Sequence, residues 1–217
     1  MKLHKIEKKV YSLSNNWVGK KHIPSIIRGL NKEFKRTIVC FSSERYEDEY
    51  YDDHNVIVSG HYCLRISNVV PEHIYICLNF PCKPKEAIIT QDGARNLAIK
   101  IIRAIHHEYR HKHQQKKRPL LLQKDYKPKP KQNKMKAMYY GNPDELDAHA
   151  HETQAEKLDI NKLRKAHKIS WEQSEAIYMY RTVFRKHDPR VWKRFLKKVY
   201  KSNEEVQTVP KGTRSQK

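Results

Sequence analysis

A proline-free stretch from Gln91 to Gln115 most constrains the fold of this chain, because it places a histidine motif inside a helical pattern. Apolar residues recur through it at three- and four-residue steps, the period of one helix face. Thr90 can cap the start, and Asp92 in the first turn is favoured by the helix dipole. We therefore predict a half-buried helix with the motif in its second half. The apolar stripe consists of Leu97, Ala98, Ile101, Ile102 and Ile105.

The motif is His107-Glu108-x-x-His111. Residues four apart lie one above the other on a helix, so His107 and His111 can bind the same ion. Zinc lowers the pKa of a bound water to roughly 7, and Glu108 is placed to accept the proton. The pattern is typical of zinc hydrolases. The alternative is a basic helix end rich in histidine, because cations are favoured at that terminus.

A second helix start lies downstream of this motif. Asn142 is a good N-cap and Pro143 suits the first helical position. A catalytic zinc takes three protein ligands and leaves one position for water, and Glu145 could be the third ligand. Alternatively Glu145 completes a capping box with Asn142, which would make His149 or Asp147 the ligand. The candidates for the third ligand are Glu145, Asp147, His149 and His151.

Two strings together carry a family resemblance. They are the HExxH motif and Tyr-x-x-Asn-Pro-Asp-Glu-x-Asp-Ala-x-Ala, which begins at Tyr139. They resemble gluzincin-type metallopeptidases, including the thermolysin-like and ImmA/IrrE-type proteins, and also zincin-like proteins of tailed bacteriophages. The resemblance covers about residues 60 to 158 and is specific at the two helices.

By that resemblance, His107, His111 and Glu145 are expected to bind Zn²⁺ and Glu108 to act as the general base. The implied activity is zinc-dependent hydrolysis of peptide bonds in a protein or peptide substrate. The implied source is a phage genome. One position departs from the pattern, because His149 stands where relatives often carry Asn or Asp.

The remaining patterns predict an α+β fold. Apolar residues at helical steps indicate an amphipathic helix within residues 18–35, and a short strand follows at Thr37–Ser42. Two β-rich runs, Gly60–Ser67 and His73–Phe80, are expected to form an antiparallel hairpin. We expect a small antiparallel sheet packed on the HExxH helix and on the third-ligand helix.

Four segments are expected along the chain. Residues 1–158 would form the zincin-like domain, with a flexible basic loop at 112–138. Residues 159–201 would form a helical basic extension, and 202–217 a disordered tail. Within the extension, Ser170 and Gln173 are expected to form a capping box. Its expected buried face is Ala176, Ile177, Tyr180, Val183 and Phe184, followed after Asp188-Pro189 by Trp192, Phe195, Leu196 and Val199.

The formal net charge of +21 is concentrated in three segments. Residues 1–36, 112–136 and 186–217 each contain ten lysines and arginines against at most three acids. Charge of this size favours contact with polyanions such as nucleic acid, although solubility alone is the simpler explanation. The alternative function is therefore a non-catalytic nucleic-acid-associated or virion structural protein on a zincin scaffold.

The sequence shows no apolar run near the roughly 20 residues that a membrane-spanning helix needs. Its N-terminus lacks the apolar stretch of a signal peptide. The four cysteines, Cys40, Cys63, Cys77 and Cys82, have neither CxxC spacing nor a dense framework. We therefore expect an intracellular protein with reduced thiols and no membrane partner, in the host cytoplasm or the virion if a phage encodes it.

Overall fold

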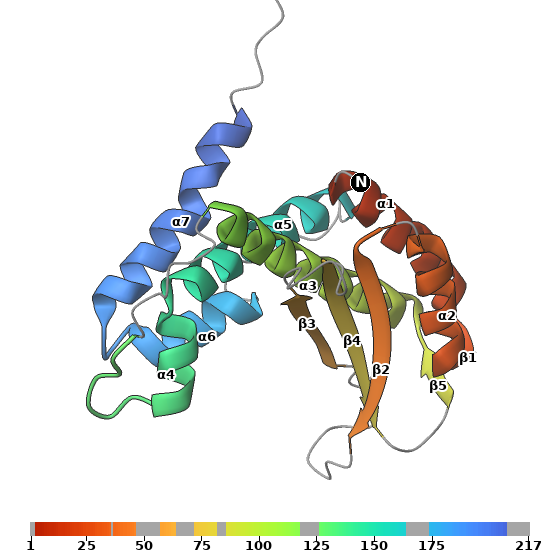
Figure 1. Ribbon diagram of the computed structural model, residues 1–217, viewed down its shortest axis with the longest axis horizontal. Helices are drawn as coiled ribbons and strands as arrows, with labels where there is room; N and C mark the ends of the chain where they lie inside the picture. Colours follow the sequence, from red (N-terminus) through yellow and green to blue (C-terminus); the bar gives the residue numbers. More distant parts are fainter. Residues whose placement is uncertain are drawn as a thin grey trace, which may run out of the picture. The chain divides into compact units, whose positions relative to one another are not determined.

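The computed structural model describes residues 3–35, 37–46, 57–63, 72–81, 86–117, 126–163 and 174–207. The fold is α+β, as predicted, and the chain divides into two compact units, residues 1–122 and 123–217 (Figure 1). Every described strand belongs to the first unit, and the regular elements described in the second unit are helices. The division differs from the expected domain end at residue 158, which lies inside the helix α5 (Pro143–Leu163).

The first unit contains a three-stranded sheet with the order β2–β4–β3. Strands β3 (Ile57–Cys63) and β4 (His73–Pro81) pair antiparallel, which confirms the predicted pairing of these two runs. Strand β2 (Val39–Tyr46) runs parallel to β4, a pairing that the sequence did not indicate. Successive residues of a strand point to opposite faces, and the alternating Ile74, Ile76 and Leu78 of β4 are fully buried.

A smaller antiparallel pair joins β1 (Gly19–His22) to β5 (Glu86–Ile89). The helix expected within residues 18–35 is α2 (Ile23–Phe34), which follows β1 and has Pro24 in its first turn. Gly19 has φ +92°, a conformation open to glycine at little steric cost, and it begins β1.

Helices cover the core of the first unit. The helix α1 (Leu3–Ser14) leads through a short 3₁₀ turn (Asn15–Trp17) to β1 and packs against α3 (Gln91–Lys117), while α2 packs on β2. Helix α3 also packs against β3 and β4, so the motif helix lies directly on the sheet. The largest fully buried core side chains of this unit are Ile6, Leu30, Phe34, Ile74, Ile76, Leu78, Ile101, Ile102 and Ile105.

The second unit contains α4 (Lys134–Gly141), α5, α6 (Glu175–Phe184) and α7 (Pro189–Gln207). Its core contains the aromatic residues Tyr180, Phe184 and Phe195, and the rings of Tyr180 and Phe195 stack at a centroid distance of 4.0 Å. The face expected on α6 is buried, and so are Phe195 and Val199 of α7. The predicted Ser170/Gln173 capping box lies outside the described residues.

Two segment boundaries differ from expectation. The basic loop expected at residues 112–138 is shorter, because α3 continues to Lys117 and α4 begins at Lys134. Helix α7 continues to Gln207, past the expected start of the tail at residue 202. Cys40, Cys63 and Cys77 are free thiols, and Cys82 lies outside the described residues. None of the helices in the described ranges has both the length and the apolar character of a membrane span.

Candidate metal centre

The helix that carries the motif is built as its pattern indicates. The backbone N–H of Gly93 donates to the Thr90 hydroxyl oxygen at 3.0 Å, which confirms the N-cap. The predicted apolar stripe is buried against the sheet and α1. These contacts hold the second half of the helix, and with it the motif, against the core of the first unit.

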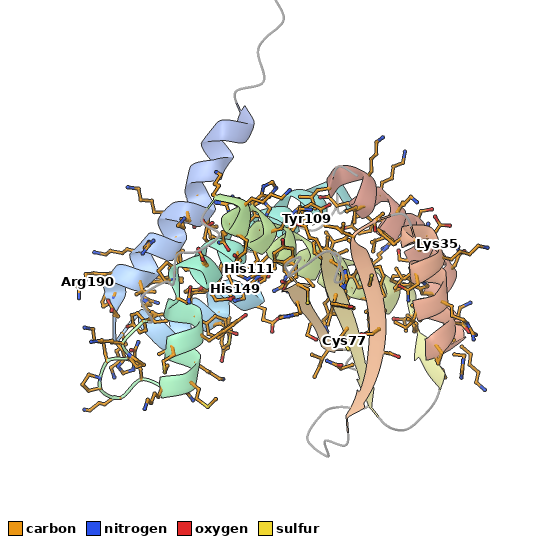
Figure 2. The ribbon with its side chains drawn as sticks, in the orientation of Figure 1. Lys35, Cys77, Tyr109, His111, His149 and Arg190 are labelled. Atoms are coloured by element: carbon orange, nitrogen blue, oxygen red, sulfur yellow. The ribbon has the colours of Figure 1, made fainter. Side chains whose placement is uncertain are left out.

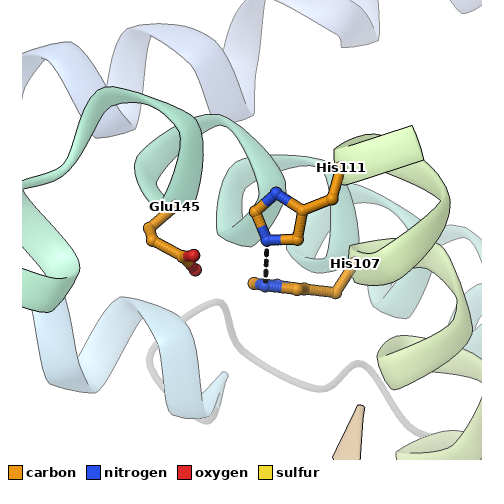
Figure 3. A group of neighbouring side chains, drawn as sticks. All are labelled: His107, His111 and Glu145. Carbon is orange, nitrogen blue, oxygen red and sulfur yellow. Dashed lines mark hydrogen bonds between the residues drawn. The ribbon is translucent and has the colours of Figure 1, made fainter. Parts of the chain in front are cut away.

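The two motif histidines meet on one face of α3. Their Nε2 atoms lie 3.0 Å apart and are hydrogen-bonded, with the ring planes at 75° (Figure 3). Two nitrogens that each lie about 2.0–2.1 Å from a tetrahedral ion are separated by roughly 3.3 Å. His107 is 6% exposed and His111 is half-buried, so both rings are largely shielded from water. This pair therefore has the geometry of two ligands of one metal ion.

A third side chain orients the His111 ring. The Nδ1 atom of His111 lies 2.8 Å from the side-chain oxygen of Gln114, which is 6% exposed. An amide oxygen can only accept, so Nδ1 carries the proton and Nε2 of the neutral ring keeps its lone pair. Metal-binding histidines characteristically donate their second N–H in this way. Gln114 was not predicted as part of the site, although its three-residue spacing from His111 was a usable signal.

The motif glutamate lies against the edge of the sheet. Glu108 is 5% exposed. A Cβ atom added at Gly60 of β3 would lie 2.7 Å from a carboxylate oxygen of Glu108, so only glycine fits there without a shift. Among the described strands, β3 pairs only with β4, which makes it an edge of its sheet. The structure thus places the candidate general base beside a strand edge.

His106, adjacent to the motif, takes no part in it. Its Nε2 atom lies 2.6 Å from a carboxylate oxygen of Glu7 on α1, where both side chains are largely buried. This contact joins α1 to α3.

Glu145 lies in the second unit, in the first turn of α5 (Figure 3). The backbone N–H of Asp144 donates to the Asn142 side-chain oxygen at 2.9 Å, so Asn142 caps the helix as predicted. A capping box would require Glu145 to accept the N–H of Asn142, but that group donates to the Tyr139 carbonyl at 3.1 Å. The N–H of Asn142 thus has a main-chain carbonyl as a partner, and Glu145 stays a candidate for either role. Its role as a zinc ligand stays a prediction.

The other candidates on α5 differ in their partners. Asp147 forms an ion pair with Lys198 of α7. The Nδ1 atom of His149 lies 3.1 Å from a carboxylate oxygen of Glu152, a carboxylate–imidazole pair that often supports metal ligation. Glu152, which follows His149 by three residues and is 6% exposed, was not predicted as part of the site.

Two tyrosines enclose this part of α5. The rings of Tyr140 and Tyr180 lie 5.1 and 5.9 Å from the His149 ring. Burial raises the pKa of both phenols, and the Glu145 and Glu152 carboxylates add to the effect. Both tyrosines therefore remain neutral at physiological pH. They give the acidic face of α5 surroundings of low polarity, where a carboxylate interacts strongly with a cation.

A cluster of polar residues in the first unit holds the strand–helix contact. The hydroxyl of Tyr62 on β3 donates to Glu72 at 2.8 Å, and Lys112 of α3 lies 3.2 Å from the same oxygen. Burial alone would raise the pKa of Glu72, but the hydrogen bonds from Tyr62 and Lys112 outweigh it and lower that pKa. Glu72 thus connects β3, the start of β4 and the residue that follows His111.

Among the described residues, the histidines and glutamates that could hold a metal ion are His107, His111, Glu145, His149 and Glu152. Imidazole and carboxylate donors suit zinc as well as iron, copper and nickel, so the donor set alone does not identify the ion. No protein-family model, curated protein or solved structure matches the chain.

Proposed function

We propose that this protein is a zinc-dependent metallopeptidase, with His107 and His111 as two of the zinc ligands. The observation that carries the proposal is the 3.0 Å approach of their Nε2 atoms, with the tautomer of His111 set by Gln114. Bound zinc would polarise the scissile carbonyl and lower the pKa of the attacking water to roughly 7. Glu108 accepts the proton of that water and then delivers it to the leaving amine.

Glu145 is the third ligand in this proposal. Its supports are the position in the first turn of α5 and the carboxylate chemistry that zinc accepts. His149 is the alternative, because Glu152 supports its ring as a metal ligand is usually supported. Asp147 is less suited, since Lys198 already pairs with it.

The edge of β3 supports a peptide as the substrate. An extended peptide can add to an exposed sheet edge through main-chain hydrogen bonds. Ser59, Gly60 and His61 of β3 are exposed, and Gly60 lies against Glu108. A peptide aligned on this edge would pass close to the general base.

Metal analysis together with one isosteric variant tests the proposal. We expect about one zinc per chain, lost in His107→Ala and in His111→Ala. Glu108→Gln should keep its zinc but cleave a denatured protein substrate at least about a hundredfold more slowly, the usual effect of losing a general base. The matched control is Glu33→Gln, an exposed carboxylate on α2, which should change neither property.

The competing function is a non-catalytic role on the same scaffold. It is favoured if the wild-type protein with zinc bound cleaves no substrate. Zinc binding that survives His111→Ala would instead contradict the ligand assignment. Glu145→Ala should weaken zinc binding by at least about tenfold; if His149→Ala does so and Glu145→Ala does not, the third ligand is His149.

A further inference from the structure

Two basic segments lie together in the second unit. The first is the chain from Tyr126 to Asn133 and the start of α4, whose exposed lysines are Lys127, Lys129, Lys131, Lys134 and Lys136. The second is the hairpin of α6 and α7. Its exposed cations are Arg181, Arg185, Lys186, Arg190, Lys193, Arg194 and Lys197, and Arg190 can be seen on the first turn of α7 in Figure 2.

Side-chain hydrogen bonds hold the first segment against the turn of the hairpin. The Tyr126 hydroxyl donates to Asp188 at 3.0 Å, and the Gln132 amide donates to the Val183 carbonyl at 3.0 Å. The Tyr126 ring packs edge-on against Phe184, with the centroids 5.5 Å apart. It also packs so closely on Gly141 that a Cβ there would lie 2.2 Å from the ring. The lysine-rich segment is therefore anchored beside the cations of the turn.

The hairpin surface carries mostly positive charge, with Glu175 as an exposed acid at the start of α6. From Ala176 to Tyr200 the only acid is Asp188, which is buried and accepts the Tyr126 hydroxyl. Two aromatic side chains lie among the cations, with Tyr178 exposed by 61% and Tyr200 by 49%. Gathering like charges from distant parts of the chain is unfavourable in itself, so a bound polyanion would offset that cost.

We propose that this surface, formed by residues 126–136 and the α6–α7 hairpin, binds nucleic acid through its phosphodiester backbone. Many separate lysines and arginines match a polymer that carries one charge per residue, because each contact releases a condensed counterion. The exposed Tyr178 and Tyr200 offer faces on which unpaired bases can stack. The surface uses none of the proposed zinc ligands, so this role is independent of peptide hydrolysis.

Fluorescence anisotropy of the full-length protein with labelled 20-nucleotide duplex DNA and single-stranded RNA tests the proposal. The test variant is Lys127→Gln/Lys129→Gln/Lys186→Gln, which spans both segments. It should bind about tenfold or more weakly near 0.1 M salt, and the slope of log K against log salt should fall by about 2 to 3. The control is Lys5→Gln/Lys32→Gln/Lys35→Gln, three exposed lysines of the first unit, which removes the same charge and should bind within about twofold of wild type.

A charge-neutral variant tests whether the two segments act as one surface. Tyr126→Phe removes the hydrogen bond to Asp188 without changing the net charge. It should weaken binding several-fold, because the segment must then be ordered on binding, while the salt slope stays close to that of wild type. Circular dichroism would confirm that the variant remains folded.

Three outcomes would overturn the proposal. The first is an equal loss of nucleic-acid affinity in the test variant and in the control variant with three substitutions, which would mean that only net charge matters. The second is unchanged affinity in Tyr126→Phe. The third is wild-type binding to anionic phosphatidylserine vesicles and not to either nucleic acid. His111→Ala should bind nucleic acid as wild type does, which separates this proposal from the proposed peptidase activity.

Discussion

At the scale of single residues, Gln114 is the side chain whose role can be tested most sharply. Its oxygen accepts the Nδ1 proton of His111 at 2.8 Å, which directs the Nε2 lone pair toward His107. Gln114→Ala should therefore lower zinc affinity by about 10- to 100-fold, the usual effect of losing such a partner. Competition with a chromophoric zinc chelator measures this affinity.

The neighbouring Gln115 provides the control for this measurement. Gln115→Ala removes the same side chain one position along the same helix, and it should leave zinc affinity unchanged. If both variants bind zinc as tightly as wild type, Gln114 does not orient a ligand. If both weaken binding equally, the effect comes from the helix and not from the hydrogen bond.

Residues related by helical spacing were predictable, while others near the motif were not. The i, i+4 relation of His107 and His111 follows from helix geometry alone, so the structure confirms that their rings meet. Gly60 lies far from Glu108 in sequence, and its close approach depends on how β3 packs on α3. Only the folded chain reveals such a position.

At the scale of elements, Glu72 joins two strands and the motif helix, and its ionisation should affect stability. The pKa of Glu72 is lower in the folded protein than its usual value of 4.5. The ionised carboxylate therefore contributes to the free energy of unfolding above pH 4.5, and this contribution is lost as the pH falls through the folded-state pKa. Glu72→Gln should lower the free energy of unfolding at pH 7 by roughly 0.5–1 kcal/mol, reduced by partial exposure to solvent.

Urea denaturation at pH 7 and at about pH 3 measures this difference. The loss in Glu72→Gln should shrink at the lower pH, because the wild-type carboxyl is then increasingly protonated. Tyr62→Phe removes one of the two partners of Glu72 and should also lower the free energy of unfolding at pH 7. If Glu72→Gln lowers the free energy of unfolding equally at both pH values, the ionised carboxylate is not the cause of the stabilisation.

Helices and strands were predictable where neighbouring residues in the sequence determine them. Helix α3 and the start of α5 were predicted because capping residues and apolar periodicity mark them directly. The parallel pairing of β2 with β4 was missed, because a parallel partner comes from a distant segment and leaves no signature in either strand alone. The antiparallel pair of β1 with β5 was missed because each strand has only four residues and the two strands are far apart in the chain.

At the scale of the whole molecule, the proposed ligand set has a thermodynamic consequence. His107 and His111 belong to the first compact unit and Glu145 to the second. A metal that binds ligands of both units stabilises both by mass action, by about 2.7 kcal/mol when free zinc is 100 times the dissociation constant. Calorimetry of the full chain with and without zinc should therefore show every unfolding transition shifted upward, or separate transitions merged into one.

The variant Glu145→Ala isolates the contribution of the second unit. With zinc present, it should leave a smaller shift that is confined to the transition of the unit that carries the two histidines. His111→Ala should abolish the shift altogether, because only one imidazole of the motif remains. Zinc could instead raise the temperature of a single transition in the wild-type protein, with the same shift in Glu145→Ala. In that case the metal binds within the first unit alone, and the third ligand must be sought among the residues near α3.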